Sequence, residues 1–198
     1  MRSARPLLCL ALVGALTLAA CRQREATPAP LANRAVPPAQ KPTPVDRGRY
    51  LVEISGCDDC HTPMAVGPSG TAPDMARRLS GHPESLKMPL PPDLPVGSPW
   101  GYVGATTNTA FAGPWGMSYA ANLTADQNTG LGIWTEEMFV GAMRTGKHMA
   151  TSRPILPPMP WRSYAKMTDD DLKAVYAFLR SVQPVVNHVP DPEITSQP

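Results

Sequence analysis

The chain has 198 residues, of which 42% are hydrophobic and 17% charged, with a formal net charge of +2 and four cysteines. Residues 1–20 contain two arginines and no acidic residue, so their removal lowers the formal net charge from +2 to zero. A neutral chain lacks the broad basic surface that binding to a nucleic-acid backbone requires. Nucleic acid is therefore not an expected partner.

The N-terminal residues have the pattern of an export signal. Arg2 and Arg5 precede an apolar run, Leu7 to Ala20, that is too short to span a membrane comfortably. The run ends in Leu18-Ala19-Ala20-Cys21, which resembles the lipobox of bacterial lipoproteins. We therefore expect residues 1–20 to be a signal peptide and lipidated Cys21 to anchor the protein to a bacterial membrane, facing the periplasm. An ordinary secretory signal followed by an incidental cysteine is the alternative.

Residues 21–44 are rich in proline and show no apolar period. The prolines in this stretch are Pro28, Pro30, Pro37, Pro38, Pro42 and Pro44. Proline at this density favours extended, semi-rigid backbone, at about 3.1 Å per residue. We expect residues 21–44 to be a tether, residues 45–190 a folded domain, and residues 191–198 a C-terminal tail.

The folded domain is expected to begin with a short helix. Asp46 is a good N-cap residue, and Gly56 can stop the helix after Ser55. Tyr50, Leu51 and Ile54 recur at helical spacing between these two positions.

Directly after this helix stands the sequence Cys57-Asp58-Asp59-Cys60-His61. Two cysteines three apart and followed by a histidine form the attachment pattern of a c-type haem, because the thiols bind the porphyrin vinyl groups and the imidazole binds the iron. We expect one covalent haem c, held by Cys57 and Cys60, with His61 as an axial ligand. Cys9 leaves with the signal and Cys21 takes the lipid, so no disulfide is needed.

Two other uses of this cysteine pair are disfavoured. A thiol–disulfide exchange protein needs a thiolate, and Asp58 and Asp59 would raise the pKa of the neighbouring thiols. A structural zinc site needs a fourth ligand beside Cys57, Cys60 and His61.

The span from Thr62 to Ile133 is rich in glycine and proline and has little apolar period, apart from a possible turn at residues 73–79. So long an irregular loop is unusual in a compact domain unless it wraps something, and a haem is something to wrap. We expect it either to cover the haem or to dock a partner. Residues 154–160 are a second irregular segment, because proline excludes a helix there.

Two further helices are expected. One runs from Thr135, a cap residue, to Thr145 before Gly146, with acidic residues in its first turn. The other begins at Thr168 and runs to Arg180. Leu172, Val175, Tyr176 and Leu179 form its apolar stripe. The expected fold is all-α, with three to four helices around one haem and a long irregular insertion after the attachment motif.

An electron-carrying haem needs a second axial ligand opposite His61, and Met159 is the best candidate. Prolines on both sides restrict its backbone, which helps to hold a soft thioether at a metal. His/Met ligation raises the reduction potential of cytochromes c. Met117 and Met149 are the reserve candidates, and filling a core gap is the ordinary alternative for any of them.

The remaining histidines, His82, His148 and His188, are expected to be solvated. Pro63 is expected to offer its carbonyl to the His61 ring N–H. The aromatic residues Trp134, Trp161 and Tyr164 are expected to line the haem crevice or to pack in the core.

Several segments together resemble a known family. These segments are Asn122–Asp126, Thr129–Trp134, Phe139–Gly146, Met159-Pro160-Trp161, Tyr164 and Asp170–Leu172. They are similar to the haem domains of cytochrome c subunits of bacterial membrane-bound alcohol and sugar-acid dehydrogenases, over about residues 46–184. The resemblance implies that Met159 is the axial methionine. It also implies that the first and last helices cross, with Gly48, Tyr50 and Tyr176 at the contact. Those subunits carry three haems in tandem, whereas this chain has a single CxxCH motif.

The sequence therefore predicts a periplasmic, membrane-tethered, mono-haem cytochrome c rather than an enzyme. It would carry one electron at a time from a dehydrogenase to an oxidase, a reductase or another cytochrome. One alternative is a haem-bearing subunit of a dehydrogenase complex. Another is a sensor or catalyst that keeps the sixth iron site open.

Overall fold

The computed structural model describes residues 41–92, 94 and 98–194. The predicted signal peptide, Cys21 and the tether as far as residue 40 lie outside the described residues. Among the helices that are described, none is both long and apolar enough to cross a membrane.

The first helix, α1 (Pro44–Ile54), delivers the chain to the CxxCH motif, as predicted. Its N-cap is Thr43, whose Oγ1 accepts the Asp46 N–H at 3.1 Å. The prediction of Asp46 as the cap is wrong, because Pro44 has the backbone angle of a first helical residue and needs no N–H partner there. Gly56 follows with a φ of +69°, a left-handed conformation that stops the helix.

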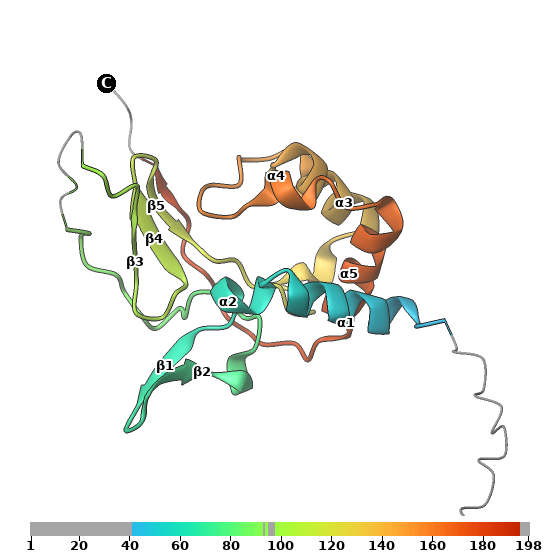
Figure 1. Ribbon diagram of the computed structural model, residues 1–198, viewed down its shortest axis with the longest axis horizontal. Helices are drawn as coiled ribbons and strands as arrows, with labels where there is room; N and C mark the ends of the chain where they lie inside the picture. Colours follow the sequence, from blue (N-terminus) through green and yellow to red (C-terminus); the bar gives the residue numbers. More distant parts are fainter. Residues whose placement is uncertain (1–40, 93, 95–97, 195–198) are drawn as a thin grey trace, which may run out of the picture. The chain divides into compact units, whose positions relative to one another are not determined.

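The helix α1 crosses the last helix, α5 (Asp169–Ser181), and the two lie side by side in Figure 1. Gly48 makes the close approach possible, since a Cβ there would lie 1.9 Å from the Ala174 carbonyl oxygen. The predicted role of Gly48 is confirmed, but Tyr50 is 52% exposed and Phe178 is the aromatic residue at the crossing. The buried core around it comprises Leu51, Val52, Leu79, Leu131, Phe139, Ala174, Val175, Phe178 and Leu179.

Helix α3 (Glu136–Thr145) packs beside α5. Both α3 and α5 have the predicted threonine caps, because the hydroxyls of Thr135 and Thr168 each accept a backbone N–H from the first turn. Gly146 ends α3 in a left-handed conformation, as expected. Three short elements complete this part: the 3-10 helices η2 (Leu131–Ile133) and η3 (His148–Ala150), and α4 (Trp161–Tyr164). Of these, η3 and α4 pack against α3.

Residues 62–133, which we call the insertion, are largely folded, so the all-α prediction is wrong for this region. A hairpin of β1 (Met64–Gly67) and β2 (Gly70–Pro73) comes first, followed by the 3-10 helix η1 (Met75–Arg77) at the predicted turn. A second sheet contains β3 (Val103–Gly104), β4 (Ala110–Gly113) and β5 (Gly116–Tyr119). These strands have two to four residues, too few to show an alternating apolar pattern in the sequence.

The second sheet is antiparallel throughout, with the order β3-β4-β5-β6 (Figure 1). Its last strand, β6 (Glu193–Ile194), comes from the segment expected to be a C-terminal tail. Met117 on β5 pairs with Glu193, and Gly116 pairs with Ile194. The end of the described chain is therefore joined to the insertion by sheet hydrogen bonds.

Candidate haem site

The CxxCH motif forms one short helix, α2 (Cys57–His61). Both cysteines are free thiols in this structure. Burial, and after it the charge of Asp58, raises the pKa of the Cys57 thiol to about 12. Burial and the charge of Asp59 also raise the pKa of Cys60. The acidic neighbours act in the predicted direction, and protonated thiols disfavour thiol–disulfide exchange.

His61 is buried, with only 7% of its surface exposed, and its ring orientation is fixed. Its Nδ1–H donates to the Ala121 carbonyl at 2.8 Å, since a carbonyl oxygen can only accept. No described residue forms a hydrogen bond with Nε2, so this nitrogen keeps the lone pair that binds a metal. Burial lowers the pKa of His61 although the bond to Ala121 opposes it, which favours the neutral, ligating form.

The predicted partner of the His61 ring is wrong. The Pro63 carbonyl instead accepts the Asp74 N–H at 2.9 Å, which starts the turn before η1. Ala121 lies sixty positions after His61 and comes from the end of the insertion. No local signal in the sequence could identify an acceptor so distant.

The side chain of Asp58 is held by Arg78 and Thr62. Arg78 donates to both carboxylate oxygens, from Nε at 2.9 Å and from Nη2 at 2.7 Å. Thr62 Oγ1 donates to Oδ1 at 2.8 Å. Burial alone would raise the pKa of Asp58, but these hydrogen bonds outweigh it and lower the pKa below its usual value. Arg78 was not predicted from the sequence, because an arginine outside a regular pattern gives no indication of its partner.

Tyr164 is the predicted crevice aromatic that lies beside the thiols. Its hydroxyl donates to the Ser55 carbonyl at 2.8 Å, at the junction of α1 and α2. Burial, followed by the charges of Cys57 and Cys60, raises the pKa of Tyr164 to about 12. Tyr164 therefore ties α4 to the start of the attachment motif.

The two predicted tryptophans support α3 and the segments next to it. The Trp134 carbonyl accepts the Tyr176 hydroxyl at 2.6 Å, and the Trp134 ring meets the His148 ring edge-on at 4.9 Å. Trp161 covers Gly146, where an added Cβ would lie 2.3 Å from the indole ring. These contacts fit the packing role that was the alternative for both residues.

Met159 lies in the irregular segment before α4 and is half-buried. Its carbonyl accepts the Trp161 N–H at 2.9 Å. Its role as sixth ligand stays a prediction. Of the reserves, Met117 is buried on β5 and its sulfur accepts the Tyr119 hydroxyl at 2.8 Å, whereas Met149 is half-buried in η3.

The prediction that His82 is solvated is wrong. Its exposed fraction is 0%, and both ring nitrogens are bonded: Nε2–H donates to the Leu86 carbonyl, and Nδ1 accepts from Thr109 Oγ1, each at 2.9 Å. Burial lowers the pKa of His82. With both nitrogens engaged, His82 is a structural residue of the insertion rather than a ligand. His148 is half-buried, and His188 is exposed as expected.

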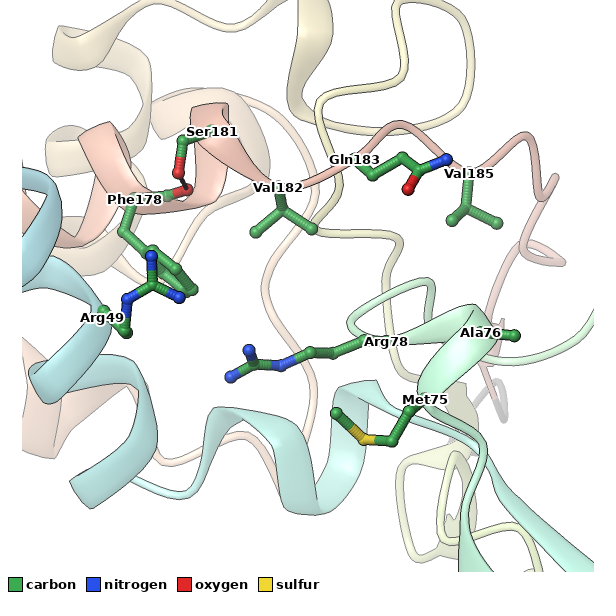
Figure 2. A pocket seen from close by; sticks show the side chains of 9 residues that line it. All are labelled: Arg49, Met75, Ala76, Arg78, Phe178, Ser181, Val182, Gln183 and Val185. Atoms are coloured by element: carbon green, nitrogen blue, oxygen red, sulfur yellow. Dashed lines mark hydrogen bonds between the residues drawn. The ribbon is translucent and has the colours of Figure 1, made fainter.

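A pocket of about 280 Å³ lies between α1, η1 and the C-terminal end of α5 (Figure 2). Arg49, Arg78 and Phe178 are among the residues that line it, but neither His61 nor Met159 is. We therefore do not assign the haem to this pocket.

The donor set at α2 fits a haem c. Two neutral thiols stand three residues apart in one helical turn, and the adjacent imidazole is buried, neutral and oriented by Ala121. Within the described segments, no three His, Cys, Asp or Glu side chains are grouped as a cage for a bare metal ion. A haem iron does not need one, because the porphyrin supplies most of its ligands and the protein only the axial ones.

No family model matches the chain. Among characterised proteins, the fructose dehydrogenase cytochrome subunit of Gluconobacter japonicus is 30% identical over 190 residues, which cover 93% of this chain and 30% of that protein. The cytochrome c subunit of the quinone alcohol dehydrogenase of Gluconobacter oxydans (strain 621H) is 31% identical, over 74% of this chain and 24% of the subunit. The gluconate 2-dehydrogenase cytochrome c subunit of Pantoea cypripedii is 28% identical, over 76% and 26%.

The chain thus spans between about a quarter and a third of the length of these relatives. The similarity covers most of this chain, including α2 and the helices around it. It agrees with the resemblance expected from the motifs. The chain is homologous to the cytochrome c subunits of bacterial alcohol, fructose and gluconate dehydrogenases.

Proposed function

We propose that the protein is a mono-haem cytochrome c that carries one electron at a time between redox partners. The observation that carries this proposal is the state of His61, which is buried, neutral and oriented by Ala121 directly after two free thiols. A histidine held in this way keeps one ring nitrogen free for a metal, because its single N–H is already donated to Ala121. The homology to cytochrome c subunits supports the same reading.

Each residue of the site has a distinct part in this proposal. Cys57 and Cys60 would hold the haem through thioether bonds, and His61 and Met159 would be the axial ligands. When bound, the haem supplies an iron couple that gains and loses one electron. The buried aliphatic and aromatic residues of α1, α3 and α5 exclude water from their side of the site, which favours a raised potential.

The proposed donor is a dehydrogenase, and the proposed acceptor is an oxidase, a reductase or another cytochrome. We also propose that the protein works in the periplasm, anchored to the membrane by lipidated Cys21. The sequence pattern around Cys21 supports this location.

A second candidate function is that of an electron-transfer subunit within a dehydrogenase complex. The observation that favours it is that the named relatives are subunits of dehydrogenases. Co-purification from native membranes distinguishes the two candidates. A dehydrogenase that stays in a fixed ratio to this chain through purification indicates a subunit, whereas release of the chain alone indicates a separate carrier.

The test of haem attachment is expression of the full chain in a bacterial host that matures c-type cytochromes. The purified protein is expected to be red, and its haem should stay on the chain during extraction with acidified acetone. A Cys57→Ala, Cys60→Ala double variant is expected to lose the haem. A colourless wild-type protein would overturn the proposal.

Met159 is tested on the same preparation. The Met159→Ala variant is expected to change a low-spin, methionine-ligated spectrum to a high-spin or open one. Met149→Ala is the matched control, because Met149 is also half-buried and lies before α4, in η3, and it should leave the spectrum unchanged. An unchanged spectrum in Met159→Ala would remove Met159 from the site.

A further inference from the structure

Arg78 contacts three helices around the attachment motif. Its two donors, Nε and Nη2, bind both oxygens of Asp58 on α2. Its Nη2 also lies 3.8 Å from Glu53 Oε1 on α1, and its Cζ lies 5.7 Å from the centre of the Phe178 ring on α5. Figure 2 shows the side chain extending from the end of η1 toward Phe178. A two-pronged arginine–carboxylate pair has a fixed geometry, so it can set the position of what it binds.

The residues after Arg78 hold the other end of the same turn. Leu79 N–H donates to Thr62 Oγ1 at 3.0 Å, and Gly81 N–H donates to the His61 carbonyl at 2.8 Å. We call residues 78–81 the brace. It bonds to the attachment turn from Asp58, directly after the first cysteine, to Thr62, directly after the histidine.

The Asp58–Arg78 pair is about three-quarters buried on both sides, with exposed side-chain fractions of 28% and 24%. Water screens the negative charge of a carboxylate at this depth less than that of a surface carboxylate. The charge therefore affects nearby groups unless a positive charge is paired with it. Asp58 follows Cys57 directly, so its charge is close to any group that Cys57 carries.

We propose that Arg78 is a positioning residue of the haem site, which fixes the attachment turn and cancels the charge of Asp58 beside it. This inference rests on the proposed attachment of haem at Cys57 and Cys60. An unpaired negative charge beside the haem stabilises the ferric state, which carries the extra positive charge, and so lowers the reduction potential. The guanidinium of Arg78 offsets that effect.

Charge cancellation and a merely structural role predict different signs. Arg78→Gln leaves the charge of Asp58 without its cation and lowers the potential. Asp58→Asn removes that negative charge, leaves Arg78 only the more distant Glu53, and raises the potential. The double variant has neither charge and returns close to the wild-type potential. If the pair only kept the turn rigid, both single variants would shift the potential in the same direction and the double variant would not restore it.

The chain offers a matched control in Arg77. It precedes Arg78 directly and has the same charge, but its Nε pairs with Asp74 Oδ2 at 2.8 Å, within the turn of η1. Arg77→Gln therefore removes a charge from the same segment without touching α2. Arg78→Lys is the second variant, because it keeps the charge and loses the two-pronged geometry.

The experiment is a potentiometric titration of the full haem-bearing chain and these variants. At a fixed ambient potential, Arg78→Gln is expected to lower the ratio of reduced to oxidised protein by between about threefold and tenfold. Tenfold is about 59 mV for a one-electron couple. In Arg77→Gln and in Arg78→Lys, the ratio of reduced to oxidised protein should stay within about twofold of the wild-type ratio. Arg78→Lys should also unfold at a lower temperature than wild type.

Two results would overturn the inference. One is an Arg78→Gln potential that matches Arg77→Gln, and the other is a shift of the same sign in Arg78→Gln and Asp58→Asn. If Arg78→Gln does not fold, Asp58→Asn and the double variant Asp58→Asn, Arg78→Lys decide the matter. The lysine keeps the positive charge, so an upward shift of the potential in both variants supports charge cancellation, and no shift overturns it. A wild-type chain without acid-stable haem would overturn the proposed function together with this inference, whereas a haem-bearing chain with unshifted potentials would overturn the inference alone.

Discussion

The helices and the insertion are stabilised in different ways. Helices α1 and α5 meet through apolar side chains, with Leu51, Val52 and Val175 buried at their contact. The insertion contributes Leu79 and Leu131 to the apolar core, but much of it is also held by polar side chains that bind backbone groups, as His82 does at Leu86 and Asn122 does at Val185. Apolar packing loses stability in proportion to the volume removed, whereas a buried polar group that loses its partner incurs its full desolvation cost.

His61 stands at the border of these two regions. Its helix, α2, continues from α1, but its ring is oriented by Ala121 and its carbonyl is bound by Gly81, both in the insertion. The difference teaches that the attachment motif depends on both regions: α1 and α5 place it, and the insertion orients its histidine. A substitution that disrupts only one of the two regions should therefore have an effect on stability that differs from disruption of the other.

The largest effect is expected at the crossing of α1 and α5. In Gly48→Val, the new Cβ would lie 1.9 Å from the Ala174 carbonyl oxygen, so the helices must move apart. We expect a loss of about 3 kcal/mol or more in the free energy of unfolding. Urea unfolding followed by circular dichroism measures it.

Gly101→Ala is the matched control for this change. An added Cβ at Gly101 meets nothing within 4 Å, so its unfolding free energy should stay within about 0.5 kcal/mol of wild type. Equal losses in Gly48→Val and Gly101→Ala would contradict the close crossing.

The next effect is expected at Asn187, which ties the C-terminal segment to the insertion. Its buried amide donates to the carbonyls of Ser80 (2.7 Å) and His82 (2.8 Å), and its Oδ1 accepts the Glu84 N–H (2.9 Å). Asn187→Ala leaves these backbone groups unpaired and should reduce the unfolding free energy by about 2 kcal/mol.

Hydrogen exchange shows where this stability is lost. Asn187→Ala should accelerate amide exchange in the insertion while α5 stays protected, and Asn128→Ala, at an exposed position, should change neither. Uniform acceleration across α5 and the insertion would mean that the two regions do not differ as described.

The helices and the insertion also differ in how far the sequence predicts them. The caps Thr135 and Thr168 and the stop at Gly146 depend on residues a few positions apart, and each was predicted correctly. The small side chain at Gly48 was also expected at the crossing. Local patterns thus account for the helices and for the residues that carry the attachment motif.

The insertion itself was predicted, but its strands and polar contacts were not, because they join distant positions. Strands β4 and β5 are four residues long and contain mainly small side chains, so neither propensity nor alternation identifies them. Thr109 forms a hydrogen bond with the buried ring of His82, and Ala121 orients the ring of His61. Neither partner is near its histidine in sequence. A polar residue in a loop shows its role only when its partner is known.

A smaller effect is the pH dependence that His82 gives to the insertion. Burial lowers its pKa, with the nearby charge of Lys87 acting in the same direction and the bond to Leu86 opposing. The unfolded chain therefore binds a proton more readily than the folded one. The contribution of His82 to stability is present above a pH of about 6.5, the ordinary histidine pKa, and is lost as the pH falls below it.

Unfolding free energies measured between neutral pH and about pH 5.5 check this sign. The wild type should lose at most about 1.4 kcal/mol per pH unit through this one group, and His82→Gln should have the shallower slope. His188→Gln, at an exposed position, should keep the wild-type slope. Equal slopes in His82→Gln and the wild type would remove His82 as the source.

The smallest effect is expected at the surface of the α1–α5 crossing, where Arg47 Nε lies 2.9 Å from Asp171 Oδ1. The pair joins the same helices as Gly48, but the Arg47 side chain is 43% exposed, so water and salt screen the attraction. Arg47→Gln should therefore change stability less than any change above, and the change should vanish in about 1 M NaCl, where the screening length is about 3 Å. Combining it with Asp171→Asn should cost little more than either change alone, because each removes the same interaction. Two results would contradict the contrast between the helices and the insertion: a loss of stability in Arg47→Gln as large as in Gly48→Val, or an effect of Arg47→Gln that persists in high salt. Either would mean that charge rather than apolar packing holds α1 against α5.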